Sequence, residues 1–166
     1  SMVGFVFFPP SPRSISIADA STLAARIPVD IKKVALTVNA DDDFLRQIAE
    51  NIGIDIFQLH GNEQPERVFE IRHTFGLPVI KALPVDDRVD LLVARGYDAV
   101  VDYFLFDSKP PKDASRPGGN ATAFDWSILK GFSLAKPWLL AGGLTPENVL
   151  QAVEISGAQI VDVSSG

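Results

Sequence analysis

The sequence predicts an α/β protein that folds as a (β/α)8 TIM barrel, and its hydrophobic pattern is the main reason. Short apolar runs rich in Val, Ile, Leu and Phe recur along the chain, and most are continuous rather than alternating. Such runs are typical of parallel strands that are covered on both faces. The predicted strands are Val3–Phe8, Val34–Val38, Ile54–Leu59, Val79–Leu83, Ala99–Phe106, Trp138–Ala141 and Ile160–Val163.

Segments with helical spacing lie between these strands. Their apolar residues recur three or four positions apart, so each segment can bury one face of a helix. The last segment begins with Thr145 as the predicted N-cap and Pro146 at the first helical position. The predicted helices are Ala18–Ile27, Asp43–Ile52, Gln64–Phe75 and Pro146–Ser156.

A repeated strand–helix unit builds either a doubly wound sheet or a closed barrel. No G-x-G-x-x-G motif follows a predicted strand, whereas polar residues follow several strands, and both observations favour the barrel. A closed barrel of this class has eight strands, but the sequence shows seven runs and both starts and stops with a strand. We therefore expect residues 1–166 to form a single (β/α)8-barrel domain that lacks its first βα unit and its last helix.

Composition narrows the classes of function. The chain has 166 residues, of which 46% are hydrophobic, so it can bury a full core. Its formal net charge of −6 argues against nucleic acid as a partner. The absence of cysteine excludes disulfides, thiolate metal sites and a thiol nucleophile within these residues. No apolar run approaches the roughly 18 residues of a membrane span, and no signal-like start is visible, so we expect a cytoplasmic protein without a membrane partner.

Small residues follow the last two predicted strands. Gly142-Gly143 comes after Trp138–Ala141, and Ser164-Ser165-Gly166 comes after Ile160–Val163. In a barrel the loops after the last two strands usually hold a phosphate, and glycines let an anion approach backbone N–H groups. The alternative is that the glycines only make tight turns. We expect a phosphate site formed by both loops.

Two basic side chains follow earlier strands. Arg13 lies in the proline-rich loop after Val3–Phe8, where its forked donors suit a planar carboxylate. His60 belongs to Gln58-Leu59-His60-Gly61, where the third run ends. The plainer alternatives are a surface arginine in a turn and a hydrogen-bonded structural histidine.

Two acidic side chains lie at the ends of later strands. Asp107 follows the apolar residues of Ala99–Phe106, and burial there favours the protonated form that a general acid needs. Its alternative use is a structural pair with Lys109. Asp162 interrupts the last run and points either into the barrel or to its rim, where substrate hydroxyls could supply the hydrogen bonds that a buried acid requires.

A long loop separates the fifth and sixth predicted strands. Lys109–Ala123 contains three prolines and the pair Gly118-Gly119. A loop of this length in a compact domain is usually functional or mobile. It either closes over a bound substrate or is a disordered insertion.

Several short stretches occur in an order that is known from one family. They are Gly4-Phe5-Val6-Phe7 with Ser11-Pro12-Arg13, Val38-Asn39, Gln58-Leu59-His60-Gly61, Val79-Ile80-Lys81-Ala82, Phe106-Asp107-Ser108-Lys109, Gly118-Gly119 with Phe124-Asp125-Trp126, Ala141-Gly142-Gly143-Leu144 and Val161-Asp162-Val163-Ser164-Ser165-Gly166. The specific combination is Gln-Leu-His-Gly together with Phe-Asp-Trp and the terminal Asp-Val-Ser-Ser-Gly. On these residues, the chain resembles the phosphoribosylanthranilate isomerase family, the (β/α)8 barrels of tryptophan biosynthesis.

The resemblance implies an Amadori rearrangement of N-(5-phosphoribosyl)anthranilate to 1-(o-carboxyphenylamino)-1-deoxyribulose 5-phosphate. This is an aldose–ketose isomerisation of a sugar phosphate, without a metal or cofactor. By the resemblance, Asp107 is the general acid that opens the sugar ring, and Arg13 pairs with the anthranilate carboxylate. The other implied site residues are His60 and Asp162 beside the substrate and Gly142, Gly143, Ser164, Ser165 and Gly166 around its phosphate.

One departure from the family pattern concerns the general base. In the family the base is a cysteine at the end of the first strand, and the sequence given contains neither that strand nor a cysteine. We therefore expect these residues alone to be inactive. An open barrel would also leave unpaired edges at Val3–Phe8 and Ile160–Val163, which favours a homodimer. Two other functions stay open: another sugar-phosphate-binding barrel isomerase, and a non-catalytic phosphate-binding fragment.

Overall fold

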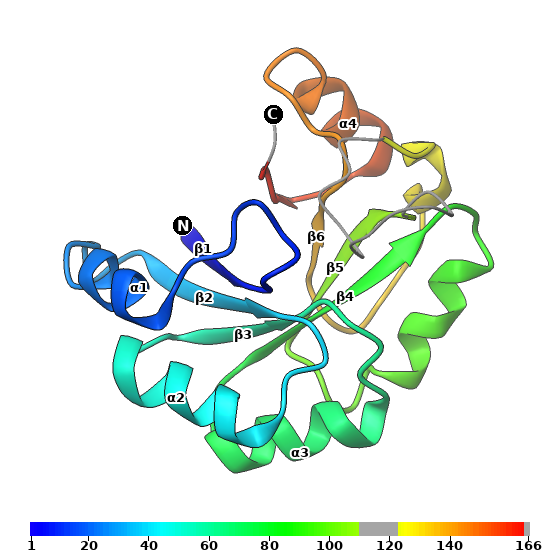
Figure 1. Cartoon of the computed structure of the whole chain (residues 1–166). Helices are drawn as coiled ribbons and strands as arrows, with labels where there is room; N and C mark the ends of the chain where they lie inside the picture. Colours follow the sequence, from blue (N-terminus) through cyan, green and yellow to red (C-terminus); the bar gives the residue numbers. More distant parts are fainter. Residues whose placement is uncertain (110–122, 165–166) are drawn as a thin grey trace. The chain divides into compact units, whose positions relative to one another are not determined.

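Strands and helices alternate along the chain in the computed structural model, which describes residues 1–109 and 123–164 (Figure 1). Two of the helices, η1 and η2, are 3₁₀ helices. The elements are β1 (Met2–Phe7), α1 (Ile17–Ala24), β2 (Lys32–Thr37), α2 (Asp42–Ile52), β3 (Ile56–Leu59), α3 (Pro65–Phe75), β4 (Val79–Val85), η1 (Asp90–Gly96), β5 (Tyr103–Ser108), η2 (Trp126–Leu129), β6 (Trp138–Leu140), α4 (Val149–Ser156) and β7 (Ile160–Val161).

The described strands form one sheet of seven strands in the order of the sequence. β1 pairs in parallel with β2, with Met2 opposite Lys32 and Phe7 opposite Thr37. The pairs β2–β3, β5–β6 and β6–β7 are parallel as well. The prediction of an α/β protein with parallel strands is therefore confirmed. The contacts divide the chain into two compact units, Ser1–Ile80 and Lys81–Gly166, and the prediction of one barrel domain over residues 1–166 stays a prediction.

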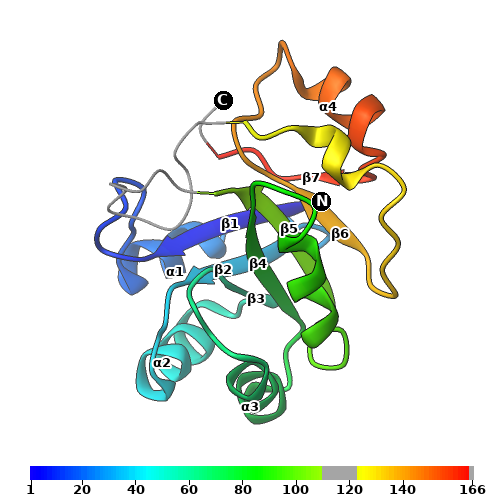
Figure 2. The ribbon, with the colours of Figure 1, turned by 90° about the vertical axis from the view of Figure 1, so that its right-hand side faces the viewer.

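In the first unit, α2 and α3 lie on the same side of β2 and β3 (Figures 1 and 2). The ring of Phe57 in β3 contacts that of Phe75 in α3, with centroids 5.3 Å apart. Because side chains alternate along a strand, Gln58 points to the face away from α3. His60 contacts Gln58 and belongs to that same face.

In the second unit, aromatic packing connects β5 to β6. The rings of Phe104 and Phe106 stack with centroids 6.1 Å apart, and Phe106 also contacts Trp138 of β6 and Phe132. Phe106 thus faces this aromatic cluster, so the next residue, Asp107, points to the opposite face of the sheet. The side chain that the sequence predicts as catalytic is positioned by its hydrophobic neighbours.

Several predicted element boundaries are wrong, and local hydrogen bonds explain two of them. The fifth strand starts at Tyr103 instead of Ala99, because the N–H groups of Val100 and Val101 already donate to the carbonyl of Tyr97. The last helix starts at Val149 instead of Pro146. Its N-cap is Asn148, not Thr145.

The side chain of Asn148 explains the later start of α4. Its Oδ1 accepts a hydrogen bond from the Thr145 N–H at 2.8 Å, and its Nδ2 donates to the Gly143 carbonyl at 2.8 Å. These bonds hold the residues before α4 as a turn, so those residues do not form the first turn of the helix.

Across the described ranges, no helix is both long enough and apolar enough to cross a membrane.

A carboxylate secures the loop after β4. Asp90, at the start of η1, accepts hydrogen bonds from the N–H groups of Asp86 at 2.8 Å and Asp87 at 3.2 Å. The Lys109 Nζ lies 3.4 Å from its other oxygen. Burial opposes ionisation of this carboxyl, but the two N–H donors and Lys109 together lower the pKa of Asp90. Asp90 therefore ties the residues after β4 to the residue that follows β5.

We expect Asp90 to make stability depend on pH in acid. Because its pKa is lower in the folded protein than the reference value of 3.8, its contribution is present above that value and is lost as the pH falls through the folded pKa. Asp90→Asn should lower the free energy of unfolding by roughly 0.5–1.5 kcal/mol at pH 7 in urea titrations. This difference should shrink as the pH falls below 3.8. Asp30→Asn, at an exposed carboxylate, is the charge-matched control. If Asp90→Asn lowered the free energy of unfolding equally at pH 7 and at a pH below 3.8, the role assigned to Asp90 would be contradicted.

Candidate functional site

Asp107 lies near the carboxyl end of β5 and is 5% exposed. Its Oδ1 accepts a hydrogen bond from the Ser108 N–H at 2.8 Å. Lys109, the alternative partner that the sequence suggested, places its Nζ beside Asp90. The structure therefore provides a buried carboxyl group at the end of a strand, which is the environment that a general acid requires.

Gly142 presses against this carboxyl group. It lies two residues after the end of β6, and an added Cβ would be 2.6 Å from the Ser108 N and 2.9 Å from the Asp107 Oδ1. The φ angle of Gly142 is 89°, a value that residues other than glycine rarely adopt. The two strand ends can approach only because this position is glycine. Gly142 is thus more than the tight turn that was the alternative prediction.

The loop after β6 contains two glycine N–H groups. The N–H groups of Gly142 and Gly143 donate to no other residue that the structure describes. The Asn148 side chain fixes this loop through the Gly143 carbonyl. Oriented and unused N–H groups in a glycine-rich turn are the usual donors for a phosphate.

The loop after β7 reaches the same edge of the second unit. Asp162 is half-buried and follows β7, and its N–H donates to the Leu140 carbonyl at 2.8 Å, at the end of β6. This bond continues the pairing of β6 with β7, and the strand ends at Val161 instead of continuing to Val163 as predicted. Ser164 is exposed. Ser165 and Gly166, and likewise Gly118-Gly119 in the long loop, lie outside the described residues.

Arg13 lies in a loop that folds back onto β1 in the first unit. The Ile15 N–H donates to the Val6 carbonyl at 3.0 Å, and the Arg13 N–H donates to the Ser11 hydroxyl at 3.2 Å. The side chain is half-buried. Within the described ranges, no residue forms an ion pair with the Arg13 guanidinium. The group is held by its loop and remains available to a carboxylate.

His60 follows β3 in the same unit. The backbone N–H of His60 donates to the Thr37 carbonyl at 2.9 Å, and the ring Nδ1 lies 3.3 Å from the Gln58 Nε2. Gln58 is buried although it is polar. An amide that donates to Nδ1 leaves the hydrogen of a neutral imidazole on Nε2. His60 is half-buried and oriented by its neighbour, as a substrate contact would need.

Sequence reasoning missed two buried charged residues. Glu63, 5% exposed, accepts hydrogen bonds from the loops after β2 and β3. Lys81 in β4 is 1% exposed, and a buried ammonium group must be compensated by acceptors or an anion. Both lie in stretches of ordinary composition. The one available signal was that Lys81 interrupts a predicted buried strand, whereas Glu63 lies four residues after the end of one.

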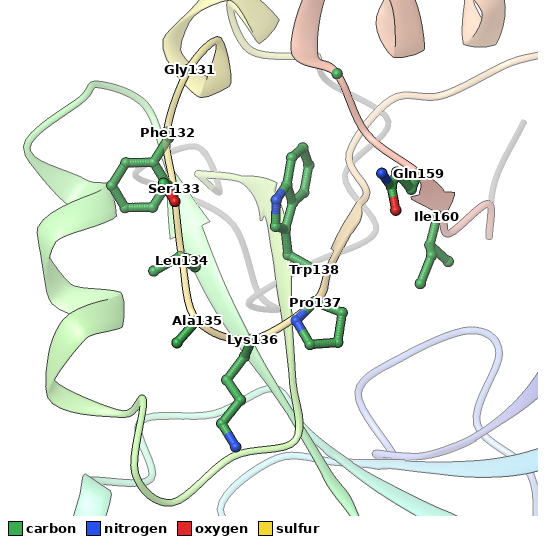
Figure 3. A pocket seen from close by; sticks show the side chains of 11 residues that line it. Gly131, Phe132, Ser133, Leu134, Ala135, Lys136, Pro137, Trp138, Gln159 and Ile160 are labelled. Carbon is green, nitrogen blue, oxygen red and sulfur yellow. The ribbon is translucent and has the colours of Figure 1, made fainter.

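A pocket of about 420 Å³ in the second unit lies apart from these residues (Figure 3). It is lined by the segment from Gly131 to Trp138 and by Gly157, Gln159 and Ile160. Trp138 and Ile160 are the first residues of β6 and β7, so the pocket lies at the amino ends of these strands, opposite to Gly142. Lys136 is its only charged lining residue. It is lined by no carboxylate or imidazole.

Metal ligands do not gather among the described residues, since no group of three or more His, Cys, Asp or Glu side chains there could hold an ion.

A comparison with known protein families gives a match over the whole chain. The sequence model of a family described as N-(5'phosphoribosyl)anthranilate (PRA) isomerase matches residues 1–166. The chain belongs to this isomerase family.

Individual members of the isomerase family agree with this assignment. The N-(5'-phosphoribosyl)anthranilate isomerase of Paramagnetospirillum magneticum is 56% identical over 164 residues, which cover 99% of this chain and 76% of that protein. The isomerase of Rhodospirillum rubrum is 53% identical and is covered over 78% of its length. A crystal structure of the Thermotoga maritima isomerase is similar with a TM-score of 0.86 and 35% identity, over 99% of this chain and 77% of that one.

The close approach at Gly142 can be tested by adding a methyl group at this position. Gly142→Ala should cost roughly 1–3 kcal/mol in the free energy of unfolding, because the new Cβ meets Ser108 and Asp107 at a positive φ. Chemical denaturation measures the loss. Gly96→Ala is the control, since Gly96 lies in the same unit with no atom near its Cβ position. Equal stability of the two variants would show that the close approach at Gly142 is not required.

Proposed function

We propose that the site residues of this chain serve the reaction of its family on N-(5'-phosphoribosyl)anthranilate, an Amadori rearrangement that gives 1-(o-carboxyphenylamino)-1-deoxyribulose 5-phosphate. The observation that carries the proposal is the buried Asp107 carboxyl beside the glycine loop after β6. A related crystal structure supports the ligand class, because it contains the isomerase in complex with reduced 1-(o-carboxyphenylamino)-1-deoxyribulose 5-phosphate. That structure is 32% identical, with a TM-score of 0.81, over 99% of this chain and 76% of that one.

Asp107 acts as the general acid in this proposal. It gives its proton to the ring oxygen of the sugar while the C1′–O bond breaks, and the nitrogen lone pair forms a Schiff base. A general base then removes the C2′ proton; the C2′–H electron pair forms a C1′=C2′ double bond, and the C1′=N⁺ pair returns to the nitrogen. The resulting enolamine becomes the ketone when C1′ takes up a proton and the C2′ hydroxyl loses one. C2′ is oxidised and C1′ is reduced, so the reaction needs no external oxidant or reductant.

The other predicted site residues take the remaining parts of the substrate. Arg13 pairs with the anthranilate carboxylate through its planar guanidinium. The N–H groups of Gly142 and Gly143 and the hydroxyl of Ser164 bind the phosphate, together with Ser165 and Gly166. His60 and Asp162 contact the sugar. We further infer that the parallel sheet follows the (β/α)8-barrel plan, in which the carboxyl ends of the strands carry the site.

In the family pattern the general base is a cysteine, and these 166 residues contain none. We therefore expect a chain of these residues to bind the reduced product analogue without turning over the substrate. Isothermal titration with the analogue and direct measurement of product formation test the two halves of this statement. Turnover by residues 1–166, free of host isomerase, would mean that the base is among the residues present.

Asp107→Asn and Arg13→Ala should affect different kinetic constants in a version of this chain to which the family's first strand, with its cysteine, has been added. An amide cannot deliver a proton, so Asp107→Asn should lower kcat by roughly 10²–10⁴-fold and leave analogue binding nearly unchanged. Arg13 contacts the carboxylate in the ground state and the transition state alike, so Arg13→Ala should mainly raise KM.

Steady-state kinetics of both variants decide between this mechanism and the alternatives. Another sugar-phosphate isomerase would show the phosphate-dependent binding but no sensitivity to Arg13→Ala. A non-catalytic phosphate-binding protein would show no turnover, either before or after Asp107→Asn.

We also propose that residues 1–166 form a homodimer. A Thermotoga maritima relative is described as dimeric. In this chain β1 and β7 are the outer strands of the sheet, and Val3 and Val161 on them are 37% and 36% exposed. Exposed strand edges attract pairing partners. Sedimentation equilibrium should show a dimer, and a monomer mass that is independent of concentration would contradict the proposal.

A further inference from the structure

A buried carboxylate connects the loops that follow β2 and β3. Glu63 Oε1 accepts a hydrogen bond from the Asn39 N–H at 2.7 Å, and Oε2 accepts one from the Gly61 N–H at 3.0 Å. The side chain is 5% exposed. A carboxylate that accepts from two backbone N–H groups makes hydrogen bonds of the strong, charge-assisted kind. Each oxygen thus holds a different loop.

The two loops also contact each other directly. Asn39 Oδ1 accepts a hydrogen bond from the Asn62 N–H at 2.8 Å. A Cβ at Gly61 would lie 2.8 Å from the Asn39 N and would collide with the Asn39 side chain, so only glycine fits. Asn39 itself has a φ of 49°, in the left-handed region. Such a conformation persists only where the surroundings fix it, and here the hydrogen bonds to Glu63 and Asn62 do so.

His60 lies in the centre of this arrangement. Its own N–H donates to the Thr37 carbonyl at the end of β2, and the next residue, Gly61, donates to Glu63. The backbone is therefore held on both sides of the His60 Cα. Gln58 orients the ring through its contact with Nδ1.

We propose that Glu63 is a positioning residue, which fixes the backbone of the loop after β3 so that the His60 imidazole meets the substrate at a defined place. The proposal rests on the proposed function in one respect, the contact between His60 and the substrate. Glu63 does not touch the substrate in this proposal. It acts through the main chain of Gly61 and Asn39.

The arrangement needs both the charge and the length of the Glu63 side chain. Glu63→Gln preserves shape, but its amide offers one acceptor oxygen and turns an NH₂ group toward the second backbone N–H. One of the two loops then loses its partner. Glu63→Asp keeps the charge on a shorter side chain, which cannot reach both N–H groups. A role through geometry predicts that both variants disturb His60, whereas a role through charge alone predicts that only Glu63→Gln does.

The test uses residues 1–166 labelled with ¹⁵N, in which His60 and His73 are the only histidines. His73 stacks on Phe69 in α3 and serves as an internal reference for the imidazole signals. Glu63→Gln and Glu63→Asp should shift the His60 ring signals and leave those of His73 in place. Glu66→Gln, at an exposed carboxylate three residues further on, is the matched control and should shift neither. Unchanged His60 signals in either Glu63 variant would overturn the proposal.

Binding of the reduced product analogue, measured by isothermal titration, shows whether the effect passes through His60. Glu63→Gln should raise Kd roughly tenfold, because a substrate contact is displaced. In a His60→Ala background the same substitution should change Kd less than twofold. A full tenfold effect in that background would show that Glu63 acts on the fold in general and would overturn the positioning role.

The two proposals fail in different ways. If the wild-type chain does not bind the analogue, or if His60→Ala binds it as the wild type does, the proposed function of this site is wrong. The positioning of His60 by Glu63 is then decided by the imidazole signals alone.

Discussion

Parallel pairing of neighbouring strands is the constraint on which the rest of this structure depends. A parallel strand must return to the same edge of the sheet before it pairs, so the carboxyl end of each strand lies beside the carboxyl end of the next. In the second unit this brings Asp107 at the end of β5 against Gly142 after β6, and Asp162 after β7 within hydrogen-bond distance of the end of β6. Residues that are far apart in the sequence become neighbours without any long-range interaction of their own.

Carboxylates then fix the loops at these strand ends, and they do so in both units. Glu63 accepts from the N–H groups of Asn39 and Gly61, and Asp90 accepts from those of Asp86 and Asp87. The backbone N–H groups that follow a strand have lost their ladder partners, and an unpaired buried N–H is costly. A short acidic side chain satisfies two of them at once. The acidic residues Glu63 and Asp90 therefore hold the backbone near strand ends, each by accepting from two N–H groups.

The sequence could predict the features that depend on periodicity and on strand order. Continuous apolar runs identified the strands, and the position of Asp107 after such a run was enough to predict its burial. Local hydrogen bonds of side chains could not be read in the same way. Asn148 replaced Thr145 as the N-cap because it binds Thr145 and Gly143, and both partners are set by the tertiary course of the loop. Glu63 was missed for the same reason, since its partners include Asn39, which is 24 residues away.

Glycine shows how closely the fold and the site are linked. Gly61 and Gly142 each lie two residues after the end of their strands, β3 and β6. A Cβ at either position would collide with the polar side chain at the end of the preceding strand, Asn39 in one unit and Asp107 in the other. The same steric rule therefore operates twice: the backbone after one strand packs directly on a polar side chain that belongs to the end of the neighbouring strand. The two segments can approach this closely only because glycine has no Cβ, so the packing itself restricts where the Asn39 and Asp107 side chains can lie.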